Sequence, residues 1–351
     1  MKIELTGMPE VIMSNPHSKH NYFAWPTVAR LQNGEIMVGA SGFRVEHVCP
    51  FGKAVVCYSN DNGKTYTLPA PVIDTPLDDR DTGICTFGKS GVIVTSFNNT
   101  AEMQRGYNQH DKYVQSYIDT ITKEDEEKYL GSLFRVSHDF GRTFGEIFRS
   151  SVTSPHGPRA LSDGTIMWAG NNYDNVRDGI EIVTLNPENG KAQLVGKITI
   201  DDDSVFLNEP NLIEMPDGRL ICHIRAEDEN ETVFTVYQSV SQDRGKTWSN
   251  PEMLLDKTGG APPHLILLSS GALLCTYGRR KQPYGIMAMV SLDGGRSWTK
   301  DLRLFETDGS DDIGYPSTIE LDDGELLTVF YARENEDPPC RIIQQRWKLI
   351  L

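Results

Sequence analysis

Residues 210–248, PNLIEMPDGRLICHIRAEDENETVFTVYQSVSQDRGKTW, contain the two patterns that decide the fold. The first is an apolar run, a turn containing Gly218 and a second apolar run, which is the short-range signature of a β-hairpin. The second is the turn SQDRGKTW from Ser241, whose Ser and Asp side chains can bond nearby backbone N–H groups while Gly takes a positive φ. Together they predict a four-stranded unit of about 50 residues, the size of a propeller blade.

Both patterns recur along the chain. The hairpin occurs six times, with turn glycines at Gly34, Gly91, Gly164, Gly218, Gly271 and Gly324. The S-x-D-x-G-x-[TS]-[WFY] turn occurs four times, from Ser59, Ser137, Ser241 and Ser291, and we expect its role to be structural. The sequence therefore predicts an all-β fold, a six-bladed β-propeller that forms a single domain over residues 1–351. Strands from the two chain ends, MKIELTG and CRIIQQRWKLIL, are expected to share the closing blade.

The second unit carries an insertion. Its S-x-D-x-G-x-[TS]-[WFY] turn, called the box below, begins 46 residues after the hairpin glycine, against 20 to 25 residues in the first, fourth and fifth units. The additional segment, residues 101–130, has the polar composition and helix-forming residues of surface helices. It follows a second strand, which places it on the face opposite to the turn glycines. Two interpretations remain open: the segment is a solvent-exposed insertion without a role in the site, or it is a lid over a site on that face.

Composition excludes several classes of function. The chain has 34 Lys and Arg against 49 Asp and Glu, a formal net charge of −15, so it would repel nucleic acid. No apolar run approaches the roughly 18 residues of a membrane span, so we expect no membrane contact. No secretory signal is visible, so we expect a cytoplasmic protein, or a secreted one if a leader has been removed. The six cysteines predict reduced core residues. Neither Cys nor His shows metal-ligand spacing, so we expect no metal or other cofactor, while a homo-oligomer is possible.

The face opposite to the turns is where chemistry is expected. Nine residues before the turn glycines, where the first strands start, stand Trp25, Thr82, Pro155, Glu209, Pro262 and Tyr315. Charged and imidazole side chains gather near the strand ends on the same face; they are Arg44, Glu46, His47, Arg80, His156, Arg159, Arg225, His264, Arg279, Arg280 and Arg333. Because arginine offers a rigid bidentate fork to carboxylate or phosphate, this cluster predicts an anionic small molecule or a sugar acid as ligand.

These residues resemble the sialidase (neuraminidase) superfamily over essentially the whole chain, and the four recurring turns resemble its Asp boxes. NEPNLIEMPDGRLICHIRAED resembles the segment that supplies the glutamate partner of the nucleophile and one arginine of a carboxylate-binding triad, which implies these roles for Glu209 and Arg225. DDIGYPSTIELDDGELLTVFYA resembles the segment with the tyrosine nucleophile, which implies that role for Tyr315. A further triad arginine would fall at Arg279 or Arg280.

The implied pair makes chemical sense. The anomeric carbon of a sialoside carries a carboxylate, so an anionic nucleophile would meet like charge. A phenol avoids this repulsion if a neighbouring carboxylate takes its proton. Glu209 and Tyr315 occupy equivalent positions two blades apart, so both should face the central channel.

Two positions depart from the family pattern. FAWP puts Ala24 where the family has the first triad arginine, and a carboxylate contact could be restored by Arg44, Arg80 or Arg159. SGFRVEHVCPFGK lacks the aspartate that acts as acid/base in the family. The candidates for that role are Glu46 or His47, and Asp79 or Asp81.

The leading hypothesis is an exo-glycosidase that hydrolyses a terminal acidic sugar, with sialic acid first among candidates. Tyr315 would be the nucleophile, Glu209 its base, Arg225 and Arg279 the anion contacts, and His47 or Asp81 the acid/base. Two alternatives remain. Another glycosidase or a polysaccharide lyase could act on uronic-acid glycans through a His/Tyr or lone His site, as His47, His156 and His264 suggest. A non-catalytic glycan-binding propeller would explain the arginine missing at Ala24.

Overall fold

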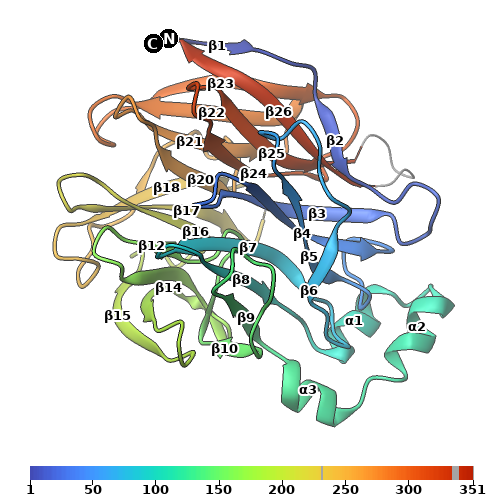
Figure 1. Cartoon of the computed structure of the whole chain (residues 1–351). Helices are drawn as coiled ribbons and strands as arrows, with labels where there is room; N and C mark the ends of the chain where they lie inside the picture. Colours follow the sequence, from blue (N-terminus) through green and yellow to red (C-terminus); the bar gives the residue numbers. More distant parts are fainter. Residues whose placement is uncertain (231, 334–339, 351) are drawn as a thin grey trace.

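The computed structural model describes residues 1–230, 232–333 and 340–350. These residues form six antiparallel sheets, and the innermost strands of neighbouring sheets contact one another round a ring (Figure 1). The fold is therefore the all-β, six-bladed propeller that the repeats predict, with a helical insertion in its second blade.

Four blades contain four strands each, in chain order from the channel outward. The first and second blades are β3 (Tyr22–Arg30), β4 (Ile36–Arg44), β5 (Lys53–Ser59), β6 (Ala70–Ile73), and β7 (Arg80–Phe87), β8 (Gly91–Phe97), β9 (Ser132–Ser137), β10 (Phe148–Ser150). The fourth and fifth blades are β16 (Val205–Glu214), β17 (Leu220–Asp228), β18 (Phe234–Ser241), β19 (Glu252–Met253), and β20 (Pro263–Leu267), β21 (Leu273–Arg279), β22 (Tyr284–Ser291), β23 (Thr299–Thr307).

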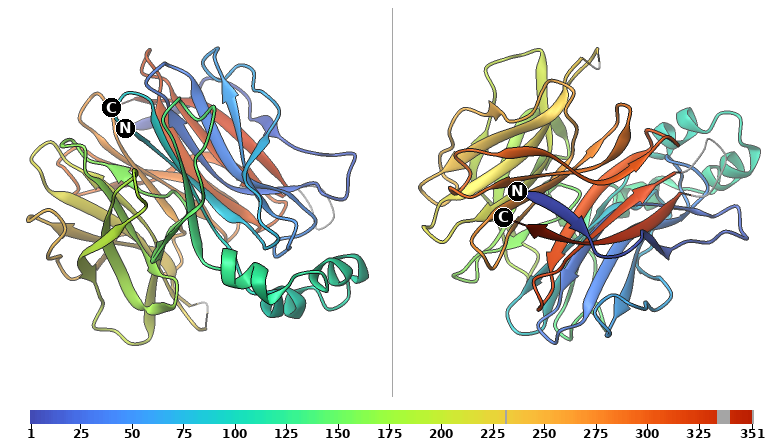
Figure 2. Two further views of the ribbon diagram at one scale, coloured as in Figure 1. Left: turned by 60° about the horizontal axis from the view of Figure 1, so that its bottom comes forward. Right: turned by 90° about the horizontal axis from the view of Figure 1, so that it is seen from above.

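The third and sixth blades differ from this plan. In the third, the inner position is shared by two short strands, both of which pair with the same neighbour; its strands are β11 (Val152–Thr153), β12 (Arg159–Ala160), β13 (Ile166–Asn172), β14 (Asn175–Leu185) and β15 (Ala192–Ile198). In the sixth, both chain ends take part; its strands are β24 (Ile313–Glu320), β25 (Leu326–Ala332), β26 (Arg341–Ile350), β1 (Lys2–Leu5) and β2 (Glu10–Met13). The pairing of β1 with β26 confirms that the two ends share the closing blade, and Figure 2 shows the termini side by side.

The recurring box is a structural turn, as predicted. In the fourth blade the Ser241 hydroxyl accepts a hydrogen bond from Gly245 N at 2.8 Å, and Asp243 accepts from both Thr247 N and Thr247 Oγ1. These bonds lower the pKa of Asp243 to about 2. The following Trp248 packs against the core between the third and fourth blades. The other three boxes make the same set of bonds to their own backbone.

A bulge recurs at the same point of four inner strands. The register of β3, β7, β16 and β24 against its neighbour shifts there, and each bulge contains one non-glycine residue with a positive φ. The four residues are Trp25 (φ 54°), Asp81 (φ 50°), Glu209 (φ 46°) and Tyr315 (φ 50°). Side chains larger than Gly adopt this conformation only at a cost of order 1–3 kcal/mol, and such strain is concentrated at functional sites. The fold thus brings these four side chains to one level of the channel.

In the second hairpin the structure shifts the predicted repeat alignment by one residue. Gly91 is the first residue of β8 and pairs with Phe87, whereas the glycine with positive φ in this turn is Gly88. In the fourth hairpin Glu214 pairs with Leu220 across five residues, and Gly218 stands two residues before Leu220. The equivalent pair in the second hairpin is Thr86 with Val92, so the counterpart of the turn glycine is position 90. Asp81, and not Thr82, consequently occupies the position equivalent to Glu209.

The insertion forms three short helices, α1 (Ala101–Tyr107), α2 (Lys112–Ile118) and α3 (Lys123–Tyr129), which Figure 1 shows at one end of the propeller. Each begins at a capping side chain, and the third has a capping box. The buried Gln104 of α1 donates to Asp78 at 3.0 Å, and Asn108 donates to Val48 O at 3.1 Å. The insertion is therefore packed against the loops of the first two blades.

Apolar side chains fill the spaces between adjacent blades. All six cysteines are buried and free, which confirms the sequence interpretation.

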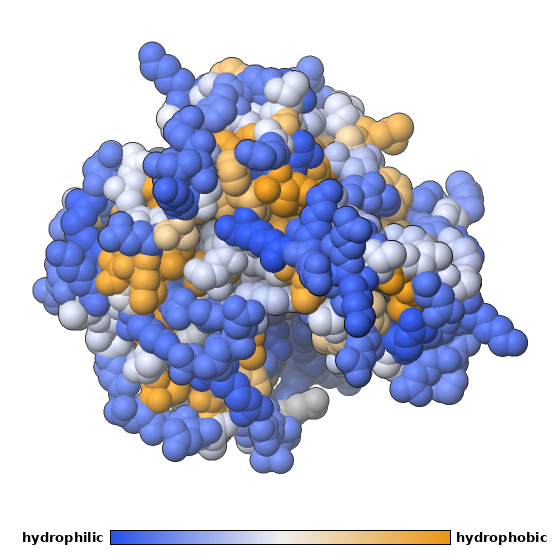
Figure 3. Space-filling view, turned by 90° about the horizontal axis from the view of Figure 1, so that it is seen from below, coloured by the Kyte–Doolittle hydropathy of each residue, from blue (hydrophilic) through white to orange (hydrophobic). Residues whose placement is uncertain are grey.

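Hydrophilic side chains predominate on the face in Figure 3, with hydrophobic ones in separate patches. Within the described ranges, no helix is long and apolar enough to cross a membrane. No cluster of three or more His, Cys, Asp or Glu in those ranges is arranged to hold a metal ion.

Candidate active site

Tyr315 and Glu209 form the centre of the site. The Tyr315 hydroxyl donates a hydrogen bond to Glu209 Oε1 at 2.5 Å, although 106 residues separate them in the chain. Tyr315 is 5% exposed, and burial together with the Glu209 charge raises its pKa well above the usual value. The phenol is therefore protonated at rest and has an acceptor for its proton already in contact.

Arg225 on β17 binds both members of this pair. Its Nη1 donates to Glu209 Oε2 at 2.8 Å and lies 3.4 Å from the Tyr315 hydroxyl. The same guanidinium forms an ion pair with Glu227, and its Cζ lies 4.8 Å from the centre of the Phe234 ring. Burial opposes the charge of Arg225, but Glu209 and Glu227 outweigh it and raise its pKa. Arg225 is thereby a fixed cation beside the phenol.

Arg280, and not Arg279, is the second arginine beside Tyr315. The Arg280 Cζ is 5.7 Å from the centre of the Tyr315 ring, and its Nη2 donates to Tyr331 at 2.9 Å. Arg279 instead donates to the backbone of Gln282. Arg225 and Arg280 both line a cavity of about 260 Å³, so two guanidinium groups that contact Tyr315 also face one space.

Asp81 shares a second cavity with Glu209. This cavity has a volume of about 480 Å³, and Arg225 and Glu227 line it as well as the smaller one. Burial raises the pKa of Asp81 to about 7, with the charge of Glu209 acting in the same direction and Arg80 opposing it. Among the described residues Asp81 has no hydrogen-bond partner. A carboxylic acid with this pKa can both give and take a proton near neutral pH.

The remaining wall of the larger cavity is part polar and part apolar, and it comes from several elements. Its apolar and aromatic members are Phe97, Met103, Pro155, Tyr173, Val176 and Phe206. Met103 and Thr100 belong to the helical insertion, which follows β8. The insertion therefore contributes directly to the wall of the cavity.

His47 belongs to a neighbouring polar cluster. Its Nδ1 lies 2.9 Å from the Tyr22 hydroxyl and 3.3 Å from Asp312 Oδ1. Tyr331 also donates to Asp312, which connects the cluster to Arg280. Burial lowers the pKa of His47 even though Asp312 opposes this, and its side chain remains 41% exposed. His47 is thus accessible, but it already has two partners.

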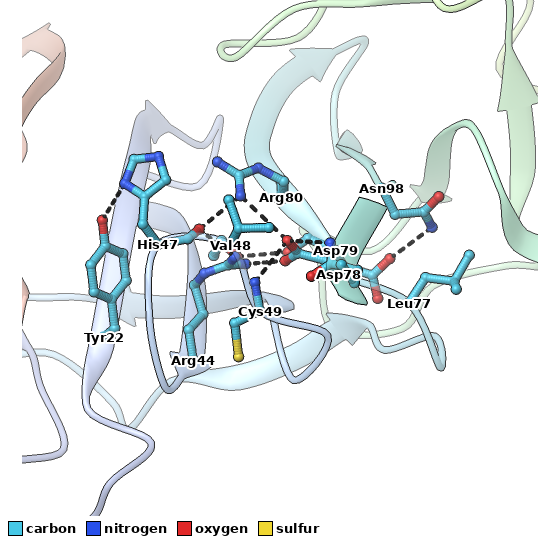
Figure 4. A network of polar contacts seen from close by, with 12 residues as sticks. Tyr22, Arg44, His47, Val48, Cys49, Leu77, Asp78, Asp79, Arg80 and Asn98 are labelled. Carbon is cyan, nitrogen blue, oxygen red and sulfur yellow. Dashed lines mark hydrogen bonds and ion pairs between the residues drawn. The ribbon is translucent and has the colours of Figure 1, made fainter. Parts of the chain in front are cut away.

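Arg44 and Arg80 converge on the buried carboxylate of Asp78 (Figure 4). Arg44 is fully buried and also donates to His47 O, so its guanidinium has a supporting role behind the cleft. Arg80 donates to the same carbonyl at 2.7 Å, and its Cζ lies 4.1 Å from the centre of the Trp25 ring. Trp25 directly follows Ala24 in the chain, so Arg80 of the second blade stacks on the residue next to the position where the first blade lacks an arginine.

Three predicted site residues do not reach this cleft. His156, Arg159 and His264 line a separate cavity in the central channel, together with residues that approach the hairpin turns. Asp79 is also absent from the cleft, because it is fully buried and accepts hydrogen bonds from Thr75 N and Oγ1. Glu46 remains at the rim, where it pairs with Arg333.

A model of the BNR repeat-like domain family matches residues 135–328, more than half of the chain. The chain belongs to this family. Sialidases are among the solved structures that share the fold of this BNR repeat-like protein, so both the repeat family and the fold agree with the resemblance to the sialidase superfamily. No curated protein matches the chain.

Three solved structures illustrate how widely the fold is shared. A protein of unknown function from Dyadobacter fermentans is 19% identical with a TM-score of 0.78, over 99% of both chains. The NanB sialidase from Streptococcus pneumoniae is 14% identical with a TM-score of 0.69, over 99% of this chain and 71% of that one. An α-L-arabinanase from Penicillium chrysogenum is 15% identical with a TM-score of 0.63, over 99% and 98%. At these identities the likeness shows the fold alone.

Sequence reasoning on this BNR repeat-like protein missed two carboxylates and two aromatic residues of the site. Asp312 lies three residues before Tyr315, and Glu227 lies two residues after Arg225, so the local segments contained a signal. The repeat register already places Trp25 at the same position as Glu209 and Tyr315, and its positive φ confirms this, but the sequence assigns it no role. Phe234 starts an outer strand, and nothing in the sequence pattern predicts its contact with Arg225.

Proposed function

We propose that this protein is a retaining glycoside hydrolase of sialidase type that removes a terminal acidic sugar, with sialic acid the first candidate. The hydrogen bond of 2.5 Å between Tyr315 and Glu209 is the observation that carries the proposal. A neutral phenol in contact with a carboxylate is a nucleophile with its base in position, which suits an anomeric carbon that bears a negative charge.

In the first step the Tyr315 oxygen attacks the anomeric carbon while Glu209 takes the phenol proton. The bond between that carbon and the leaving-group oxygen breaks, and Asp81 gives this oxygen its proton. In the second step Asp81 takes a proton from water, and the water oxygen attacks the anomeric carbon. The bond to Tyr315 then breaks and Glu209 returns the proton to the phenol. Two displacements at one carbon retain its configuration.

We assign the acid/base role to Asp81 in preference to His47. The Asp81 pKa of about 7 allows it to be protonated in one step and ionised in the next. It also lines the same cavity as Glu209. His47 has a lowered pKa and is engaged with Tyr22 and Asp312, which favours an orienting role at the rim.

The arginines support an acidic sugar as substrate. Arg225 and Arg280 both contact Tyr315, and both line the cavity of about 260 Å³, so a carboxylate on the anomeric carbon would meet them there. Arg80 is the proposed third contact, because it lies over Trp25 next to Ala24. Arginine is the side chain best suited to bidentate recognition of a carboxylate.

The test is hydrolysis of an aryl α-sialoside by wild type, Tyr315→Phe and Glu209→Gln, with Tyr237→Phe on β18 as the matched control. We expect kcat to fall at least about a hundredfold in the two site variants, the lower end of what a positioned proton-transfer group supplies. The control should retain wild-type turnover. Unchanged turnover in Tyr315→Phe would refute the nucleophile assignment.

A second candidate function is cleavage of uronic-acid glycans by a His/Tyr site. The contact of 2.9 Å between His47 and Tyr22 favours it, because a histidine beside a phenol can exchange protons near neutral pH. A lyase of this kind releases an unsaturated product that absorbs ultraviolet light. The absence of such a product across uronate polymers would remove this candidate.

A further inference from the structure

A second cavity lies in the central channel beneath the bulge layer. It has a volume of about 440 Å³, within the range of small-molecule sites. Its polar lining comes from all six blades, in the third blade from β12 and from the break between β11 and β12; the members are Thr27, Thr86, His156, Arg159, Asn211, His264 and Thr318. It also reaches Arg30 and Glu320, which lie next to hairpin turns, so its mouth is on the face opposite to the candidate active site.

The bulge layer separates this cavity from the cleft. None of the four bulge residues lines it, and its lining begins two residues beyond Trp25 and Glu209, at Thr27 and Asn211. Gly83 and Gly157 meet at this level, because a Cβ on Gly83 would lie 2.4 Å from Gly157 N. A ligand in the channel would therefore enter from the turn face and leave Tyr315 and Glu209 untouched.

Arg159 presents a cation to this cavity without a carboxylate partner. Its Nε donates to Leu212 O at 3.3 Å and its Nη2 to Leu265 O at 2.9 Å, which holds the guanidinium across the channel. Within residues 1–230, 232–333 and 340–350, no acidic side chain lies within ion-pair distance of it, and Nη1 has no hydrogen-bond partner. The acidic residue at the mouth, Glu320, is already bonded to Ser269. Arg159 is half-buried, and a guanidinium that lines a cavity without a carboxylate partner attracts an anion.

His156 supplies a second unsatisfied group. It is 4% exposed, its Nδ1 lies 3.1 Å from Thr27 Oγ1, and its Nε2 has no partner among the described residues. Since the Thr27 hydroxyl can donate to Nδ1, the tautomer with a proton on Nε2 is available to a ligand. The neighbouring His264 ring is 4.9 Å away and accepts from Thr318 N, so it is already satisfied. Burial lowers the pKa of His156 to about 3, which keeps its ring neutral in the absence of an anion.

We propose that the channel cavity is a binding site for a small organic anion of the carboxylate or phosphate-monoester class, held by Arg159 and His156. The oxyanion accepts from Arg159 Nη1 and His156 Nε2. Its organic part lies against the apolar side of the cavity, which is formed by Ile84, Ile213, Ile266 and Ile319. The site is independent of the proposed glycosidase activity.

Inorganic phosphate and acetate serve as probes for the two anion classes. Each is titrated at constant ionic strength into wild type, Arg159→Met, Arg225→Met and Arg142→Met, and the rise in melting temperature gives the apparent affinity. Arg142 is an exposed arginine paired with Glu35, and its variant controls for loss of one surface charge. We expect a saturable rise for at least one probe in wild type, Arg225→Met and Arg142→Met. In Arg159→Met the affinity should fall at least about tenfold, as for loss of a charge-assisted hydrogen bond.

A saturable rise that is lost in Arg225→Met but retained in Arg159→Met would overturn the proposal, because the anion would then bind in the cleft. No saturable rise in wild type with either probe would also overturn it. If Arg159→Met fails to fold, a bromide soak of wild-type crystals replaces it. The proposal predicts an anomalous peak within about 3.5 Å of the Arg159 guanidinium, and peaks elsewhere with none in the channel would contradict it.

Discussion

The buried carboxylate of Asp78 connects the first blade, the second blade and the helical insertion. It forms ion pairs with Arg44 and Arg80, and it accepts hydrogen bonds from Cys49 N at 3.2 Å and Gln104 at 3.0 Å. Burial opposes its ionisation, but Arg44 and Arg80 outweigh this and lower its pKa. We predict that Asp78→Asn, which preserves the volume and removes the charge, strongly destabilises the protein.

The magnitude follows from what the substitution leaves behind. The side chain of Arg44 is fully buried, and its other acceptors are the Ser41 hydroxyl and His47 O. Removing one partner of a buried pair leaves an uncompensated charge and costs about 3–5 kcal/mol. The matched control is Asp322→Asn, because Asp322 pairs with Arg30 while its side chain is 81% exposed. Such a surface pair contributes only about 0–1 kcal/mol.

Urea unfolding at neutral pH measures both losses in the free energy of unfolding, with circular dichroism before denaturation to establish that each variant folds. The pH dependence gives a second check. Because the folded-state pKa of Asp78 is lowered, its contribution is complete above the unfolded-state pKa of about 3.9 and is lost as pH falls through the folded-state pKa. Losses for Asp78→Asn and Asp322→Asn within 1 kcal/mol of each other, about the error of comparing two extrapolated values, would refute the reasoning.

Three further predictions concern the site and the channel. Asp81 must be protonated to assist departure of the leaving group, so kcat should fall as pH rises through about 7. In a pH–rate profile this fall at alkaline pH should disappear in Asp81→Asn and persist in His47→Gln. The reverse pattern would assign the acid to His47. Gly83→Ala should cost about 1–3 kcal/mol in urea unfolding, because the added Cβ meets Gly157 N at 2.4 Å. Gly106→Ala in α1, where a Cβ meets nothing within 4 Å, should instead stabilise the protein by roughly 0.5–1 kcal/mol. Equal changes in the free energy of unfolding for the two substitutions would contradict the close packing of the channel wall.

The repeats made the fold and the central pair predictable. Glu209 and Tyr315 stand at the same distance from Gly218 and Gly324, and this spacing alone placed them on one level of one channel. Asp81 was harder to place by position, because the turn around Gly88 shifts the hairpin register by one residue. A register error of one residue is enough to exchange Asp81 for Thr82.

Depth along the channel was not predictable in the same way. His156, Arg159 and His264 lie on inner strands or between them, as expected, but only a few residues further along than the bulge layer. Because each residue advances a strand by about 3.3 Å, this displacement moves their side chains out of the cleft and into the channel. Long-range contacts were also invisible, such as the bond of 2.8 Å from Tyr22 to Asp312, which depends on closure of the ring between the first and sixth blades.

The central claim is that Tyr315 is the nucleophile and Glu209 its base. A sialosyl fluoride with a second fluorine beside the anomeric carbon forms the covalent intermediate but hydrolyses it slowly, so peptide mass spectrometry after short incubation locates the labelled residue. We expect one sugar adduct on Tyr315, slower labelling in Glu209→Gln and none in Tyr315→Phe. An adduct on another residue, or turnover of an aryl sialoside with no adduct at Tyr315, would contradict it.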